Sequence, residues 1–188
     1  MIMLIDSHAH LDMPHFDADR DAVIVRAREA SVAAILTLGV DRASSQRAVT
    51  LAQRYEGVFA AVGIHPHEAK HATPEDYNAL MGLAREREVN RIIAWGEIGL
   101  DYHYDYSPRD VQQREFRRQV RIARELDLPV CIHSRDAHDD VLTILAEEHA
   151  IDAGAVMHCF SGDELVARRC LDLGFYISFA GPVTFTNA

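Results

Sequence analysis

Cysteine is scarce in this sequence, and no two cysteines have the CxxC spacing of a metal or redox motif. The three that occur, Cys131, Cys159 and Cys170, cannot all pair with one another. A disulfide framework is therefore excluded, and we expect free thiols in a reducing compartment, the cytoplasm. We expect all three to pack in the core, Cys159 because side chains alternate along a strand.

Long apolar runs and linkers are missing as well. No run approaches the roughly 18 apolar residues of a membrane span, and the first residues lack the basic and apolar regions of a signal peptide. No Pro/Gly/Ser-rich or low-complexity stretch divides the chain. We therefore predict a single domain over residues 1–188, with no membrane association and no indication of an obligatory protein partner.

The sequence has fewer basic than acidic residues. The chain has 19 Lys and Arg against 29 Asp and Glu, a net charge of −10. This balance argues against a broad basic surface that holds nucleic acid by charge alone. A phosphate substrate remains compatible with it if metal ions supply positive charge locally.

Short apolar runs alternate with segments of helical spacing. The runs expected to form strands are residues 2–5, 33–38, 58–64, 92–95, 129–132, 155–157 and 175–179. The clearest helical segments are residues 17–30, 44–55, 74–87 and 108–126, the last with Ser107 as N-cap before Pro108. This alternation predicts successive βα units and a parallel sheet, with about seven strands and six helices.

The ends of the predicted strands favour a barrel over a doubly wound sheet. A doubly wound nucleotide-binding fold has a Gly-rich turn after its first strand, whereas this chain has Asp6-Ser7-His8-Ala9-His10 there. Polar residues at the ends of several strands are typical of a TIM barrel with its site at the C-terminal face. We therefore predict an α/β fold of the TIM-barrel metallohydrolase class, incomplete here because an eighth strand is missing.

Ligand-type side chains end four of these strands. His8 and His10 are two residues apart, so both point to one side of the first strand. Glu97, His133 and His158 follow three further strands. His133 or His158 alone is better explained as a polar strand cap, but four such ends together predict a site for zinc, manganese, iron, nickel or magnesium.

Five segments of the chain form a more specific pattern. They are residues 6–12 (DSHAHLD), 63–67 (GIHPH), 96–102 (GEIGLDY), 128–137 (LPVCIHSRDA) and 158–162 (HCFSG). In this order, between Ile5 and Asn187, they resemble the TatD family of metal-dependent deoxyribonucleases, part of the amidohydrolase-like metallohydrolase superfamily of TIM barrels. The resemblance implies a hydrolase that cleaves phosphodiester bonds, with DNA as its substrate.

The resemblance also implies a binuclear centre of two divalent ions, Mg²⁺, Mn²⁺ or Zn²⁺. By the family pattern His8 and His10 bind one metal, His133 and His158 bind the second, and Glu97 bridges them. Two rival functions remain open. One is an amidohydrolase-type enzyme acting on amides, lactones or phosphotriesters, although many of those bridge their metals with a modified lysine. The other is a catalytically weak metal-binding protein.

Some residues near these motifs have less certain roles. His65 matches a family histidine beside the substrate phosphate, and with Glu97 it is our predicted catalytic residue. For Arg135 a phosphate contact and an ion pair with Asp136 are both open. Asp101 either lines the cleft or caps the next helix. Asp6 either orients a metal ligand or accepts a buried hydrogen bond.

One part of the family pattern is not found. The family binds its first metal with a further aspartate from a Glu-Thr-Asp type motif on the eighth strand, and the sequence ends before such a motif. It is also about 60 residues shorter than the ~250 of a complete barrel. We expect a piece of a longer chain, in which case this stretch alone hydrolyses poorly. A natural short variant that closes its barrel by association is the alternative.

Overall fold

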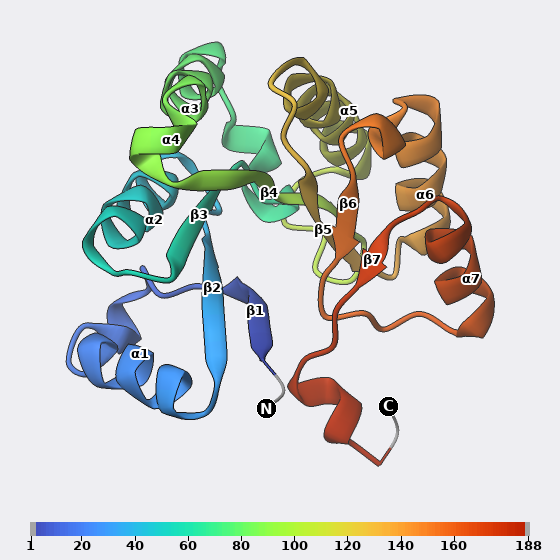
Figure 1. Ribbon diagram of the computed structural model, residues 1–188. Coiled ribbons are helices and arrows are strands. Elements are labelled where there is room, and N and C mark those ends of the chain that lie inside the picture. The colour runs from blue at the N-terminus through green and yellow to red at the C-terminus, as the bar shows by residue number, and fades with distance from the viewer. Residues whose placement is uncertain (1–2, 187–188) are drawn as a thin grey trace.

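The computed structural model describes residues 3–186 as one curled parallel sheet with helices outside it (Figure 1). The seven strands of these residues are ordered β1-β2-β3-β4-β5-β6-β7, each parallel to its neighbours. Two predicted positions, Ile2 in the first strand and Asn187 at the end of the family resemblance, lie outside the described residues. Within this range no helix combines the length and apolar character that crossing a membrane requires.

The elements follow the predicted alternation. The strands are β1 (Leu4–Ala9), β2 (Val32–Leu38), β3 (Val58–Val62), β4 (Ile92–Asp101), β5 (Val130–Arg135), β6 (Ala155–Met157) and β7 (Tyr176–Ile177). The helices are α1 (Arg20–Glu29), α2 (Arg42–Arg54), α3 (Pro74–Arg85), α4 (Arg87–Asn90), α5 (Arg109–Glu125), α6 (His138–Glu147) and α7 (Glu164–Asp172). Short 3-10 helices are η1 (Pro14–Phe16), η2 (Pro66–His71), η3 (Ala150–Asp152) and η4 (Gly181–Thr184). Each of the six connections between consecutive strands thus contains a helix, and the third contains two.

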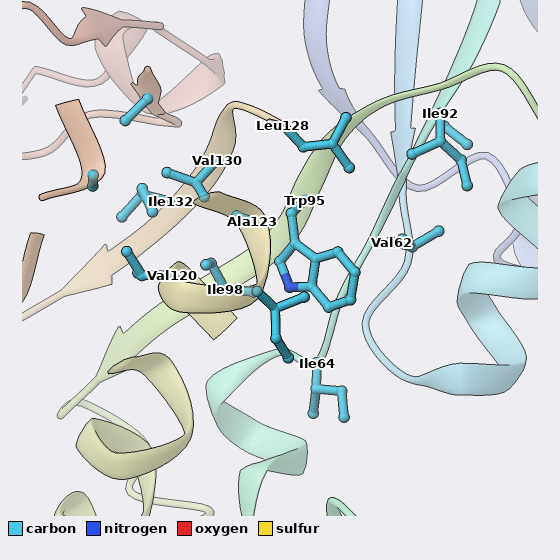
Figure 2. Packing of buried hydrophobic residues seen from close by; sticks show 14 of the residues in the cluster. Val62, Ile64, Ile92, Trp95, Ile98, Val120, Ala123, Leu128, Val130 and Ile132 are labelled. Carbon is cyan, nitrogen blue, oxygen red and sulfur yellow. The ribbon is translucent and has the colours of Figure 1, made fainter. Parts of the chain in front are cut away.

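The main core lies between the sheet and the helices. Its largest fully buried side chain is Trp95, which is surrounded by apolar residues of β3, β4, β5 and α5 (Figure 2). A smaller cluster on the inner face of the curled sheet comprises Leu36, Leu38, Ala61, Ala94 and Cys131. Neighbouring strand residues therefore face two apolar layers, as expected of parallel strands covered on both sides. Cys131 and Cys170 are buried, as predicted.

Several element ends differ from the prediction. The strands β1 and β4 continue past their apolar runs, and β7 is limited to Tyr176–Ile177. The prediction that Ser107 caps α5 is wrong, because the helix begins at Arg109 after Pro108. The Ser107 hydroxyl instead donates to the carbonyl of His67 and accepts from the backbone N–H of Lys70. This serine therefore ties the start of α5 to η2.

Gly99 occupies the closest approach between β4 and β5. Its φ is +145°, and a Cβ added there would lie 1.9 Å from the carbonyl oxygen of His133. Only glycine fits this backbone conformation and this spacing. The position therefore fixes how near β5, and with it His133, comes to β4.

We predict that Gly99→Ala lowers the free energy of unfolding by about 2–5 kcal/mol, since it adds backbone strain and a steric clash. Gly82→Ala is the matched control, because Gly82 lies in α3 with open space around its Cα. That substitution should be neutral or stabilise by up to about 1 kcal/mol. Urea denaturation measures both, and equal midpoints for the two variants would contradict the assignment.

Candidate metal centre

Polar residues from three strands, and from the segments just after two strands, meet at the same end of the sheet. His8 lies in β1 and His10 just beyond it, Glu97 lies in β4, His133 lies in β5, and His158 directly follows β6. Glu97 occupies an irregularity in the pairing of β4 with β5, and its backbone N–H donates to the carbonyl of Gly39 after β2. The curl of the sheet thus places one carboxylate among side chains far apart in the sequence.

One oxygen of this carboxylate faces the first histidine pair. Glu97 Oε2 lies 3.0 Å from His8 Nε2 and 3.2 Å from His10 Nε2. The other ring nitrogen of His10, Nδ1, is 3.0 Å from the carbonyl oxygen of Leu38. A carbonyl only accepts, so Nδ1 has a proton, and in a neutral imidazole Nε2 presents its lone pair toward Glu97. Although burial lowers the pKa of His10, contact with Glu97 raises it overall, and a protonated ring donates from Nε2 to the carboxylate.

The other oxygen faces three more imidazoles. Glu97 Oε1 lies 2.6 Å from His158 Nε2, 3.0 Å from His133 Nδ1 and 3.5 Å from His65 Nε2. The far nitrogen of His133, Nε2, is 3.0 Å from Asp101 Oδ2, and this carboxylate oxygen accepts a hydrogen bond from the Nε2–H group. The two oxygens of Glu97 therefore divide the histidines into two sets.

His65 has the opposite arrangement of its ring nitrogens. Its Nδ1 accepts a hydrogen bond from the backbone N–H of His67 at 3.2 Å. In a neutral imidazole this leaves the proton on Nε2, the nitrogen that faces Glu97. In the neutral state His65 therefore presents a donor to the centre, whereas neutral His10 presents a lone pair there.

Burial and charge set the protonation of the centre. Burial would raise the pKa of Glu97, but contacts with His10 and His133 hold it well below its usual value. Burial lowers the pKa of His65 to about 4 and also lowers the pKa of His158. For His133 burial is outweighed by Asp101 and Glu97, which raise its pKa to about 9. At neutral pH the carboxylate is ionised and His65 and His158 are neutral.

Asp101 and His67 belong to this centre, and the sequence analysis did not assign them to it. The Oδ2 atom of Asp101 accepts hydrogen bonds from His67 Nε2 at 2.9 Å and from His133 Nε2. Asp101 is only 1% exposed, and it orients one of the predicted ligands. The sequence did contain a signal for both residues, an even spacing from a predicted site residue. Asp101 lies four residues after Glu97 on the same strand, and His67 lies two residues after His65.

These side chains line a cleft of about 440 Å³. Its lining residues are His8, His10, Met13, Val40, His65, His67, Glu68, Glu97, His133, His158, Cys159 and Ala180. The prediction that Cys159 packs in the core is wrong. Because β6 ends at Met157 and Cys159 has a positive φ of 44°, strand alternation no longer applies there.

Within residues 3–186, Arg135 and Asp6, whose roles the sequence left open, do not contact the imidazoles of the centre. Arg135 is exposed, and its guanidinium lies 4.9 Å from the ring centre of Tyr104, while Asp136 pairs with His103 at 3.1 Å. Among the described residues Arg135 thus contacts an aromatic ring rather than Asp136. Asp6 is exposed and accepts a hydrogen bond from the backbone N–H of His8 within β1, so in the part of the chain that the structure describes it contacts that backbone and not an imidazole.

Two buried glutamines on one face of α5 fix the backbone of the site. Gln112 accepts from the N–H of Asp101 at 2.8 Å and donates to its carbonyl at 3.0 Å. Gln119 likewise accepts from the backbone N–H of Ile64 at 2.8 Å and donates to its carbonyl at 2.9 Å. It also accepts from the indole N–H of Trp95. Each amide satisfies both backbone groups of a residue at or next to the centre, as a neighbouring strand would.

The donor set fits divalent metal ions. When His10 is neutral, its Nε2 and Glu97 Oε2 are both acceptors, so their 3.2 Å separation requires a proton or a cation between them. His158 Nε2 lies 2.6 Å from Glu97 Oε1 without the alignment of a hydrogen bond. Imidazole nitrogen with carboxylate oxygen is the ligand chemistry of zinc, manganese and iron. Two compact ligand sets are His8, His10, Glu97 and His65, Glu97, His133.

Comparison with known proteins decides the family. Residues 5–188 match the family model described as TatD related DNase. The chain belongs to the TatD family. It is 46% identical to the uncharacterized metal-dependent hydrolase YabD of Bacillus subtilis over 186 residues, which cover 99% of this chain and 72% of that protein. It is 39% identical to the 3'-5' ssDNA/RNA exonuclease TatD of Citrobacter koseri over 180 residues, 96% of this chain and 68% of that one.

Solved structures agree with this assignment. The TatD homologue YJJV of Escherichia coli K12 superposes with a TM-score of 0.91 at 33% identity, covering 98% of this chain and 71% of that one. A TatD family hydrolase of Entamoeba histolytica, 22% identical, shares the fold with a TM-score of 0.85 over 94% of this chain and 64% of that one. The predicted TIM-barrel-like fold and TatD resemblance are confirmed, and the chain is a TatD-like metal-dependent hydrolase that uses divalent metal.

We predict that Gln112→Met lowers the free energy of unfolding by about 2–4 kcal/mol, because both backbone groups of Asp101 lose a buried partner. Gln46→Met, at an exposed position of α2, should change it by less than about 0.5 kcal/mol. Chemical denaturation of both variants measures the difference. Parent-like stability of Gln112→Met would show that these hydrogen bonds do not fix the end of β4.

Proposed function

We propose that this protein hydrolyses phosphodiester bonds of nucleic acid, DNA in the first place, at a centre of two divalent cations. The observation that supports this most is the division of the histidines between the two oxygens of Glu97. The relative from Citrobacter koseri is named a 3'-5' ssDNA/RNA exonuclease, which makes single strands the first substrates to test. The acidic composition fits, because the cations would supply the positive charge that the surface lacks.

In this proposal the metal ligands form two groups that share one carboxylate. His8, His10 and Glu97 Oε2 would hold one cation, and His133, His158 and Glu97 Oε1 the other. Two cations bound there would supply a more acidic coordinated water and positive charge for the phosphoryl oxygens. With four imidazoles, the donor set favours Mn²⁺ or Zn²⁺ over Mg²⁺. Asp101 accepts the far N–H of His133 and so aims its Nδ1 at the centre.

His65 would act on the substrate rather than on a metal. Its neutral ring presents Nε2–H to the cleft, because Nδ1 already accepts from the N–H of His67. A buried N–H donor next to the cations suits a non-bridging phosphate oxygen, whose negative charge it stabilises as the bond breaks. His65 is close enough to Glu97 to join a ligand set geometrically, so the assignment depends on the position of its proton.

A substrate panel tests the proposed reaction. The full chain, loaded with Mn²⁺, Zn²⁺ or Mg²⁺, is incubated with end-labelled single-stranded DNA, duplex DNA, RNA, a lactone and a phosphotriester. We expect shortening of the oligonucleotides that EDTA abolishes and added metal restores. Turnover of the lactone or the phosphotriester without oligonucleotide cleavage would favour the amidohydrolase-type alternative and refute the proposal.

We predict that Glu97→Gln loses one or both metals and lowers turnover at least about a hundredfold, because it removes the shared charge between two cations. Glu115→Gln is the matched control, since Glu115 is also a buried carboxylate but contacts Tyr77, and neither residue lines the cleft. Metal analysis and rates on the same samples separate the two variants. Parent-like metal content and rate in Glu97→Gln would show that Glu97 does not bridge.

We predict that His65→Ala lowers turnover by about a hundredfold while the metal content stays that of the parent protein. The reason is that the variant removes a donor to the phosphate and no lone pair from the centre. His71→Ala, at an exposed position of η2, should leave both quantities unchanged. Loss of a stoichiometric metal ion from His65→Ala would make His65 a ligand instead.

A further inference from the structure

Two exposed tyrosines stand on the loop between β4 and α5. Tyr104 is 46% and Tyr106 56% exposed. Their rings are stacked, with centroids 5.3 Å apart and planes inclined by 16°. Neither the fold nor the proposed chemistry requires a parallel pair of aromatic rings that faces solvent.

This aromatic pair adjoins the metal cleft. The ring of His67, which lines the cleft, meets Tyr106 edge-on at 4.7 Å and Tyr104 edge-on at 5.6 Å between centroids. A molecule leaving the cleft past His67 therefore meets the two tyrosines next. The exposed parts of the two rings offer aromatic surface there, and Tyr106 is exposed by the larger fraction.

The loop is held in place before any ligand arrives. Asp101 Oδ1 accepts hydrogen bonds from the backbone N–H groups of His103 at 3.0 Å and Tyr104 at 2.9 Å. Its other oxygen accepts from two histidines of the centre, so one buried carboxylate connects the loop with the site. Arg109 pairs with Asp105 at 3.0 Å and donates to the carbonyl of Tyr102. A ligand that stacks here therefore does not bear the entropy cost of ordering the loop.

A positive charge accompanies the aromatic rings. The guanidinium of Arg135 lies 4.9 Å from the centre of the Tyr104 ring, on a chain whose net charge is −10. An aromatic surface for bases with an arginine for phosphates is how proteins bind single-stranded nucleic acid without reading its sequence. Among ligand classes, this combination favours a nucleotide over an uncharged lactone or amide.

We propose that Tyr104 and Tyr106 form a stacking platform for an unpaired nucleobase whose neighbouring phosphate lies in the metal cleft, with Arg135 contacting a phosphate of the same strand. The proposal rests on the proposed function and specifies its substrate class. A base in a duplex already has both faces covered, so the platform selects single strands. DNA and RNA both present such bases, and the platform does not distinguish them.

Binding measurements test the platform separately from catalysis. The probe is a single-stranded oligonucleotide with phosphorothioate linkages, which slow cleavage, and 2-aminopurine near its end. It is added to the metal-loaded full chain, and fluorescence quenching and anisotropy are recorded. We expect Tyr104→Leu with Tyr106→Leu to weaken binding tenfold or more and to abolish the quenching. Tyr104→Phe with Tyr106→Phe, which keeps both rings, should stay within about twofold of the parent protein.

Two controls make the readout specific for stacking. Tyr176→Leu, at an exposed tyrosine of β7 outside the cleft lining, should bind as the parent protein does. An oligonucleotide with abasic end positions should bind the parent protein and the leucine variant equally, because it has no base to stack.

The outcomes separate this proposal from the proposed function. Equal binding of the normal oligonucleotide by the leucine variant and the parent protein would overturn the platform, even if the parent protein cleaves DNA. Weakened binding and lost quenching in the leucine variant support the platform. If they occur while no variant cleaves any phosphodiester, the proposed reaction fails and the platform stands as a binding site.

Discussion

The centre of this molecule depends on a single buried carboxylate. Glu97 is only 2% exposed, and burying an uncompensated charge would cost several kcal/mol. It is compensated by histidines from β1, β5 and the turns after β1, β3 and β6. Those segments meet only because the sheet curls, so the fold and the chemistry have one common requirement. Each oxygen faces its own set of rings, which is the arrangement that a bridging ligand needs.

A second set of polar contacts makes this arrangement rigid. Asp101 contacts His133 and His67 through one oxygen and the following loop through the other. The helix α5 fixes that segment through Gln112 and the segment before His65 through Gln119. Each of these buried amides satisfies two backbone groups. A substitution at Gln112 or Gln119 is therefore expected to shift the backbone beside His133 and His65, which the glutamines themselves do not contact. Ligand positions held in this way are the general condition for metal chemistry at a fixed geometry.

Strand alternation and strand ends were enough to predict the fold class and five of the residues that meet at the centre, His8, His10, Glu97, His133 and His158, whereas His65 came from the family resemblance. His8 and His10 have a local signal, the two-residue spacing, and the others follow apolar runs. The contact of Asp101 with His133 and that of Ser107 with His67 could not be read from the sequence, because the partners lie more than 30 residues apart and come together only in the folded sheet. Cys159 was misplaced because a positive φ ends the alternation. The tyrosine pair was missed because its position beside the cleft depends on the loop conformation.

The central claim is that the two oxygens of Glu97 serve two different cations. Anomalous scattering from crystals soaked in Mn²⁺ tests it directly. The account predicts two peaks about 3.5–4 Å apart, one beside His8 and His10 and the other beside His133 and His158, with His65 bound to neither. A single peak shared by all the histidines, or a peak with His65 among its ligands, would contradict it.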